Sequence, residues 1–204
     1  DDQGLILPPR LAPIQIVIVP IYKNDEEKAL VLPAAEAAQK ALSAFRVKLD
    51  AREELTPGFK FNDWELRGVP LRVEIGPKDV EKNSVALARR DKPGREGKSF
   101  VQQAGLVDTI NQLLVDIQAS LLKRATEYRD ANIHDPKDYE ELKQVVQDGW
   151  ALSYWCESKE CEAKVKEDTK ATTRNIPFEQ PDHGGTCIVC GKPSKRKVYF
   201  AKAY

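Results

Sequence analysis

Four cysteines are the residues of this chain whose type and spacing point most directly to chemistry, and all of them lie in its last third. Cys156 and Cys161 are five residues apart, and Cys187 and Cys190 are three residues apart. A structural zinc ion takes four ligands in a tetrahedron, commonly thiolates, and each short pair can supply two of them. The spacing therefore predicts a closed zinc site that folds its domain and does not catalyse.

Other interpretations of the cysteines stay open: two disulfides, four free thiols, or a redox-active pair. A secreted disulfide protein usually spreads its cysteines along the chain, whereas close pairs favour a metal site in a reducing compartment. A thioredoxin-like dithiol begins a helix, but Cys187 and Cys190 lie in a short loop between glycines. His183 could replace a thiolate, yet four cysteines already complete the shell, so we expect a solvent-exposed loop histidine.

A second cluster, in the first half of the chain, combines aromatic, acidic and basic side chains. Phe61 and Glu65 are four residues apart and share one face of an expected helix. Arg72 lies on the polar face of the next expected strand, and Lys78 and Asp79 follow at its end, in an expected loop. A carboxylate can accept the N–H donors of guanine, cations suit its O6 and N7 acceptors, and an aromatic ring can stack on an unpaired base. The cluster is therefore a candidate base-reading pocket at one edge of a sheet.

On spacing alone, an ordinary structural role for these residues is favoured over a base-reading pocket. Aromatic residues at helical spacing usually belong to a core, and at least one of Phe59, Phe61 and Trp64 must pack inward. Arg72 and Glu74 alternate with apolar residues, and this pattern is also typical of a strand with one face exposed to solvent.

The elements expected around these residues form an α/β domain with a mixed sheet. Thr56 can cap a helix that Gly68 ends, and Pro33 suits the first position of another. A polar turn is expected at 91–99. Strands are expected at 14–21, 46–51, 69–76 and 83–89, and helices at 33–45, 57–67 and 106–132.

A second unit is expected after the long helix, because Asp135 precedes a proline and such a residue rarely continues a helix. It contains a helix at 138–147, the cysteine region and a final strand at 197–204. The expected divisions are a linker at 1–13, an α/β domain at 14–132 and a small α+β zinc-binding domain at 133–204.

The composition excludes some classes of function. The chain has 204 residues, of which 32 are basic and 32 acidic, so any contact with nucleic acid must come from a local patch. This balance disfavours a sequence-blind DNA coat protein. No run of 18 apolar residues is present, which excludes a membrane span by the ordinary criterion. The first residues show no signal-peptide pattern and are typical of the interior of a longer protein.

Over its whole length the chain resembles the C-terminal part of prolyl-tRNA synthetases. The opening DDQGLILPPRLAP resembles the junction that follows their last catalytic motif, and PGFKFNDWELRGVPLRVEIGPKD, from Pro57 to Asp79, resembles their anticodon-binding domain. The two cysteine pairs and the terminal Tyr204 resemble the C-terminal zinc domain of the archaeal and eukaryotic-like branch, which also occurs in some bacteria.

This resemblance implies a five-stranded mixed-sheet domain that reads the two guanines of the proline anticodon, followed by a zinc domain. The parent would be a cytoplasmic, homodimeric class II enzyme that activates proline with ATP and magnesium and transfers it to its tRNA. Phe61, Glu65, Arg72, Lys78 and Asp79 fall at the family's anticodon contacts; Cys156, Cys161, Cys187 and Cys190 fall at its zinc ligands; and the carboxylate of Tyr204 would approach the catalytic domain.

The chain lacks the catalytic motifs of that family, so on its own it is expected to be non-catalytic and to need neither ATP nor magnesium. Two rival functions are a structural zinc-bearing module that stabilises a parent protein or dimer, and a dithiol redox enzyme that uses Cys187 and Cys190. Selective, salt-sensitive binding of one tRNA would favour the tRNA-reading function over both rivals.

Overall fold

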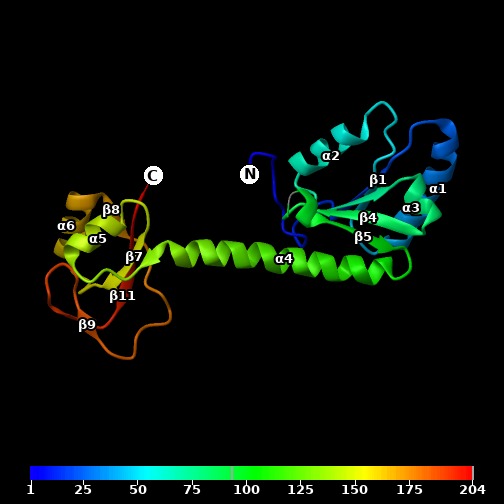
Figure 1. Ribbon diagram of the computed structural model, residues 1–204. Coiled ribbons are helices and arrows are strands. Elements are labelled where there is room, and N and C mark those ends of the chain that lie inside the picture. Colours follow the sequence, from blue (N-terminus) through cyan, green and yellow to red (C-terminus); the bar gives the residue numbers. More distant parts are fainter. Residues whose placement is uncertain (93, 204) are drawn as a thin grey trace. The chain divides into compact units, whose positions relative to one another are not determined.

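The computed structural model describes residues 1–92 and 94–203 (Figure 1). Tyr204, to which the resemblance gives a role, lies outside the described residues. The chain forms two compact units, Asp1–Arg124 and Ala125–Tyr204, and one long helix, α4 (Leu106–Ala131), contributes residues to both. No helix of the described ranges is long and apolar enough to cross a membrane.

The first unit is built on a mixed five-stranded sheet, as expected, with the order β2-β1-β3-β4-β5. β1 pairs in parallel with β2 and β3, whereas β4 pairs antiparallel with β3 and β5. The continuous run of β-branched residues explains why every residue of β1 is buried. The strands are β1 (Ile16–Pro20), β2 (Val47–Leu49), β3 (Leu71–Ile75), β4 (Ser84–Arg89) and β5 (Lys98–Gln102).

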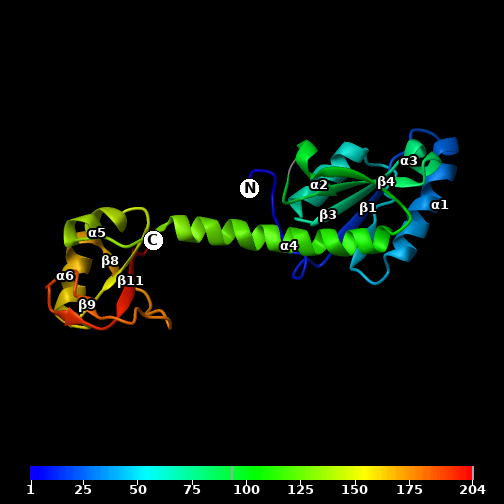
Figure 2. The ribbon, with the colours of Figure 1, turned by 60° about the horizontal axis from the view of Figure 1, so that its bottom comes forward.

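Helices cover the two faces of this sheet unequally (Figures 1 and 2). α1 (Asp25–Ala41) and α4 pack on one face, where Val31, Leu87 and Ile110 belong to the main core. α2 (Pro57–Leu66) packs on the other face through Trp64, against Val17 of β1. Over β4 and β5, no helix of the described residues covers that face.

Two expectations about helix ends meet different outcomes. Thr56 caps α2 by accepting a hydrogen bond from the Phe59 N–H, and Gly68 follows the helix with a φ of +73°, both as expected. The expected start of α1 at Pro33 is wrong, because Asn24 caps the helix by accepting from the Glu27 N–H. Pro33 lies inside α1 and forgoes one helical hydrogen bond there.

The stretches expected to be loops hold regular structure. Lys78 and Asp79 belong to a short helix, α3 (Pro77–Glu81), and the polar turn at 91–99 contains a 3-10 turn, η1 (Gly94–Gly97), and the start of β5. The residues expected to form a linker pack within the first unit: Leu5 donates its N–H to the Leu66 carbonyl, and Arg46 donates to the Ala12 carbonyl.

The second unit holds a four-stranded sheet with the order β6-β7-β11-β8 and a two-stranded β9-β10 ribbon. Its core includes Leu142, Val165 and Phe200. The cysteine region contains more structure than expected, since β7, α6 and β8 lie within or beside it. The elements are β6 (Ile133–His134), α5 (Tyr139–Val145), β7 (Trp150–Tyr154), α6 (Lys159–Thr169), β8 (Ala171–Thr173), β9 (Gly185–Thr186), β10 (Pro193–Ser194) and β11 (Lys197–Lys202).

Candidate functional site

A pocket of about 340 Å³ lies in the first unit, on the side of the sheet that carries α2. The pairing register places Arg72 of β3 beside Ala88 of β4, and Ala88 beside Lys98 of β5. Ala88 has a small side chain and forms the bottom of the pocket, and the longer side chains around it form the walls. The lining residues are Gln3, Phe61, Glu65, Arg72, Glu74, Ala88, Arg89, Arg90, Gly94, Arg95 and Lys98.

Arg72 is the centre of this pocket. Its Nη1 donates to Glu65 Oε1 at 2.6 Å and its Nε donates to Glu74 Oε1 at 3.1 Å. Its guanidinium carbon lies 4.0 Å from the centroid of the Phe61 ring, in cation–π contact. Glu74, whose side chain is 5% exposed, also accepts from Lys98 Nζ at 2.7 Å. These contacts hold the guanidinium in one orientation before any ligand arrives.

Glu65 keeps acceptor capacity for a ligand. Its side chain is 30% exposed, and Arg72 occupies Oε1, whereas no hydrogen bond from the described residues reaches Oε2. A carboxylate held beside a fixed guanidinium and an aromatic ring presents acceptors, donors and an apolar face to one planar group. The structure thus brings together Phe61, Glu65 and Arg72, three of the five residues singled out from the sequence.

Lys78 and Asp79 are not among the described lining residues of this pocket. They lie on α3, beyond the opposite end of β3 from Arg72. The Asp79 carboxylate accepts the Gly76 N–H at 2.9 Å and so caps α3, while Lys78 is exposed.

Two further arginines of the pocket are bound to acidic residues. Arg89 forms two hydrogen bonds with the Asp91 carboxylate, at 2.9 and 2.7 Å. Arg90, only 3% exposed, binds the Asp1 carboxylate at 2.9 and 2.6 Å and donates to the Glu65 carbonyl at 3.2 Å. Arg90 therefore ties the N-terminal segment to the turn of α2 that carries Glu65.

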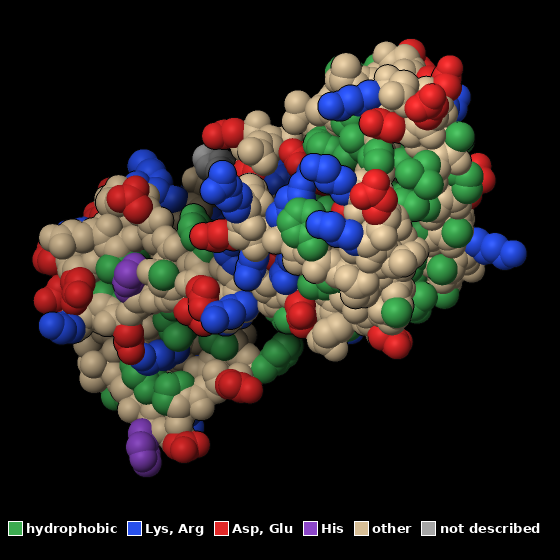
Figure 3. Space-filling view, turned by 45° about the vertical axis from the view of Figure 1, so that its right-hand side comes forward, with side chains coloured by type: hydrophobic (Ala, Val, Ile, Leu, Met, Phe, Trp, Pro, Cys, Tyr) green, Lys and Arg blue, Asp and Glu red, His purple; other side chains and the backbone are tan. Residues whose placement is uncertain are grey.

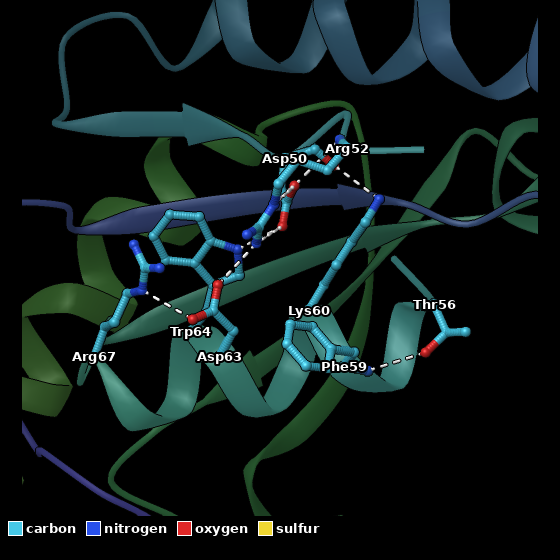
Figure 4. A network of polar contacts seen from close by, with 8 residues as sticks. All are labelled: Asp50, Arg52, Thr56, Phe59, Lys60, Asp63, Trp64 and Arg67. Atoms are coloured by element: carbon cyan, nitrogen blue, oxygen red, sulfur yellow. Dashed lines mark hydrogen bonds and ion pairs between the residues drawn. The ribbon is translucent and has the colours of Figure 1, made fainter. Parts of the chain in front are cut away.

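A buried polar network fastens α2 to the sheet (Figure 4). The Asp50 carboxylate accepts two hydrogen bonds from Arg52, at 2.8 and 2.7 Å, and one from Trp64 Nε1 at 2.7 Å. Lys60 Nζ donates to the Asp50 carbonyl at 3.3 Å, and Arg52 also reaches Asp63 at 2.8 Å. Since Trp64 lies between Phe61 and Glu65 in sequence, this network sets the position of both pocket residues.

The charge of Asp50 is stabilised within this network. Burial by itself would raise the pKa of Asp50, but the hydrogen bonds from Arg52 and Trp64 outweigh it and lower the pKa from 3.8 to about 2. Burial lowers the pKa of Lys60 from its usual value. Asp50 is thus an anion under all ordinary conditions, even though the residue is only 2% exposed.

The second unit brings the four cysteines together. Their Sγ atoms all lie within 4.8 Å of one another, with Cys156 3.5 Å from Cys161 and 3.7 Å from Cys190. A tetrahedral zinc site with Zn–S bonds of about 2.3 Å has edges of about 3.8 Å, so the cluster has the size of such a site. The separations exceed a disulfide bond of about 2.05 Å, and all four thiols are free.

Local structure presents each thiol to the cluster. Cys156 follows β7, and Cys161 lies in the first turn of α6, where its N–H is capped by Ser158 Oγ at 3.2 Å. Cys187 and Cys190 share a turn closed by the hydrogen bond from the Gly191 N–H to the Cys187 carbonyl, and Gly191 has a φ of +72°. Burial raises the pKa of the Cys161 thiol to about 12, so a nearby cation is needed to hold it as a thiolate.

His183 is exposed and is not part of this cluster, as expected. Its carbonyl accepts a hydrogen bond from the Tyr154 hydroxyl at 2.7 Å. The donor set is therefore four cysteine sulfurs, which suits zinc better than the hard cations magnesium and calcium.

Comparison with known proteins identifies the two halves of the chain. Residues 15–112 match the family described as anticodon binding domain, and residues 139–204 match the family described as prolyl-tRNA synthetase, C-terminal. The chain carries an anticodon-binding domain and a prolyl-tRNA synthetase C-terminal domain. The pocket lies mainly in the anticodon-binding domain, and all four cysteines lie in the C-terminal domain.

Relatives named proline–tRNA ligase match both domains together. The protein from Roseiflexus sp. is 53% identical over 208 residues, which cover 100% of this chain and 43% of the relative. The chloroplastic/mitochondrial protein from Arabidopsis thaliana is 49% identical over 210 residues, or 39% of its length. The chain thus spans about two fifths of these relatives, and the two domains that it matches are not the catalytic part of such enzymes.

Proposed function

We propose that this chain is the tRNA-reading part of a proline–tRNA ligase and that its pocket binds a guanine of the proline anticodon. The observation that carries the proposal is the contact of Arg72 with both Glu65 and Phe61 inside a matched anticodon-binding domain. Lys78 and Asp79 would contact the anticodon from α3, at the other end of β3.

The chemistry of the pocket suits an unpaired guanine. The free acceptor of Glu65 can take the N–H donors of the Watson–Crick edge, and the guanidinium of Arg72 can donate to an oxygen or nitrogen acceptor of the base. Phe61 and the flat guanidinium offer stacking surface. Because neighbouring acids and the Phe61 ring hold Arg72 in place, little ordering of this side chain is needed on binding.

The four cysteines are proposed to hold one structural zinc ion. When bound, the ion would satisfy four thiolates and join the turn after β7, the start of α6 and the turn that follows β9. The support is the size of the cluster and its all-sulfur donor set.

The parent enzyme is proposed to belong to the archaeal and eukaryotic-like branch, to act as a cytoplasmic homodimer, and to use ATP and magnesium in its catalytic part. The C-terminal domain that matches residues 139–204 and the cysteine pairs support the branch, and free cysteines fit a reducing compartment. Tyr204 is proposed to direct its carboxylate toward the catalytic part. The domain division proposed from the sequence, at 132/133, also remains a proposal.

A binding titration tests the function. Proline tRNA and a variant with both anticodon guanines changed to adenines are titrated against the chain at moderate salt. We expect clearly weaker binding of the variant. Equal binding of the two tRNAs, or none, would contradict anticodon reading and favour a module whose role is structural.

Replacing Glu65 with glutamine is expected to abolish most of the preference for guanine. The substitution keeps the shape of the side chain but removes its charge and one acceptor, and such a base contact contributes about 1–3 kcal/mol of discrimination. Because the Glu65–Arg72 ion pair is partly exposed, stability should fall by less than about 1 kcal/mol. The ratio of the two dissociation constants is the measurement.

The matched control is Glu36→Gln, which changes an exposed glutamate on α1, on the other side of the sheet. It should leave the ratio unchanged. Unfolding of the domain by Glu65→Gln would show that Glu65 has a structural role and would overturn the assignment.

Replacing Lys78 with alanine is expected to weaken binding of both tRNAs and to flatten its salt dependence. Loss of one cation that contacts a phosphate lowers the slope of log K against log salt by about 0.7. The titration is repeated at several salt concentrations, with Lys82→Ala, an exposed lysine at the end of α3, as the control. A slope equal to that of the unaltered chain would place Lys78 away from the RNA.

A further inference from the structure

The open part of the sheet face beside the pocket carries an aromatic side chain that the pocket does not use. The register places Glu74 beside Ala86, and Ala86 beside Phe100 of β5, in the row next to that of Arg72, Ala88 and Lys98. Paired residues project on the same side of a sheet, so Phe100 shares the face of the pocket. Its ring is 71% exposed.

The residues around Phe100 leave the face of its ring exposed to solvent. The neighbouring positions on β4 are alanines, Ala86 and Ala88, which are too short to cover it. Lys98 Nζ lies 5.9 Å from the ring centroid, and Glu74 holds this amine at 2.7 Å. An exposed aromatic ring on a sheet, next to small residues and a cation, is the arrangement on which single-stranded nucleic acids stack their bases.

Among the described residues that line the pocket, Arg95 is a basic side chain for which no partner is found. Arg72, Arg89, Arg90 and Lys98 each bind a carboxylate. Arg95, on η1, is exposed and makes no hydrogen bond or ion pair with the residues that the structure describes.

The position of η1 is constrained by its packing. A Cβ at Gly97 would lie 1.9 Å from the Lys92 carbonyl oxygen, so only glycine fits there. η1 lies directly before β5, and its Arg95 is one of the residues that line the pocket.

We propose that this face is a second nucleotide subsite, in which Phe100 stacks on the unpaired base next to the one in the pocket and Arg95 binds a phosphate beside them. Successive bases of a single strand are joined through one phosphate each. A stacking ring on the same sheet face as the pocket, together with the cation of Arg95 that lines the pocket, therefore matches one additional nucleotide. The inference rests on the proposed function of the pocket. Stacking does not distinguish bases, so this subsite adds affinity and not guanine preference.

The test compares Phe100→Leu with Phe100→Trp in the complete chain, titrated with proline tRNA and with its guanine-to-adenine anticodon variant. Leucine keeps apolar contact but removes the aromatic face, whereas tryptophan keeps it. We expect leucine to weaken binding of both tRNAs by about fivefold or more, with their ratio unchanged, and tryptophan to bind as the unaltered chain does. Phe178→Leu, a change of another exposed phenylalanine, is the control and should have no effect.

A second arm uses Arg95→Gln, for which the salt slope should fall by about 0.7, and Arg95→Lys, which should restore it. Normal binding by Phe100→Leu, or equal loss with leucine and tryptophan, overturns stacking, and an unchanged slope overturns the phosphate contact. If the unaltered chain does not prefer the guanine anticodon, the proposed function itself fails and this inference fails with it. A preference that persists while Phe100→Leu is silent refutes the inference alone.

Discussion

The chain with Cys190 replaced by serine should lose its zinc and unfold its C-terminal unit while the first unit stays folded. A serine hydroxyl is a poor zinc ligand, and binding of a structural zinc ion supplies about 10–16 kcal/mol in small zinc domains. Cys190 is exposed, so the substitution removes little packing, and the loss should come from the metal. Metal content and amide hydrogen exchange of the two units are the measurements, with residues beyond Asp135 expected to lose protection first.

The control for this prediction is Thr186→Ser, an exposed position beside Cys187. It should keep one zinc ion per chain. Treatment of the unaltered chain with a strong chelator should reproduce the exchange pattern of Cys190→Ser. A full equivalent of zinc in Cys190→Ser would refute the four-thiolate site.

The cysteine site was predictable from the sequence because its information is local. A metal turn needs two cysteines a few residues apart and a glycine that tolerates a positive φ, and Cys187, Cys190 and Gly191 are adjacent in the chain. The sequence did not predict the strands that lie beside the two cysteine pairs. β7 and β8 depend on pairing with β11, which lies far along the chain, and no local sequence pattern reports this pairing.

The pocket was predictable in part, for the same reason. Helical spacing places Phe61 and Glu65 on one face, and alternation places Arg72 and Glu74 on another, so Glu74 was within reach of the sequence pattern. Lys98 was not, because β5 lay in a segment expected to be a polar turn. Arg90 could not be found either, since its partner Asp1 is at the far end of the unit's sequence.

The position of α1 shows how a local rule can mislead. Proline favours the first turn of a helix, which suggested a start at Pro33. The capping hydrogen bond of Asn24 and the acidic first turn that follows it outweigh the one hydrogen bond lost at Pro33.

Acidic and basic side chains are intermixed on the face shown in Figure 3, in keeping with the balanced charge of the chain.

Replacing Asp50 with alanine is expected to destabilise the first unit by about 3 kcal/mol. The change leaves Arg52 without its main partner and the buried Trp64 Nε1 without an acceptor, and breaking a buried ion pair costs about 3–5 kcal/mol. The lower value applies because the Arg52 side chain is 34% exposed and keeps Asp63. Urea unfolding followed by signals of the first unit measures the change, and Asp130→Ala, which breaks an exposed pair, should cost less than about 1 kcal/mol.

The same network predicts how stability depends on pH. The pKa of Asp50 is about 2 in the folded chain and has an ordinary value of 3.8, so the unfolded chain binds more protons between these values. The stabilisation is therefore complete above about pH 4 and is lost as the pH falls toward 2, with a total of about 2 kcal/mol from this carboxylate. In Asp50→Asn the group cannot titrate, so its first unit should lose about 2 kcal/mol less than the unaltered chain over this range.

Loss of the Asp50 carboxylate should also affect the pocket. Asp50 accepts a hydrogen bond from Trp64, and Trp64 lies in sequence between Phe61 and Glu65, the two α2 residues that line the pocket. Asp50→Asn keeps an acceptor for Trp64, whereas Asp50→Ala does not, so only alanine should loosen α2 in the folded state. We expect Asp50→Ala to reduce the preference for the guanine anticodon even where the chain is fully folded, and Asp50→Asn to retain most of it. If both variants keep the full preference, the network stabilises the domain without positioning Phe61 and Glu65, and the pocket is held by Arg72 and Arg90 alone.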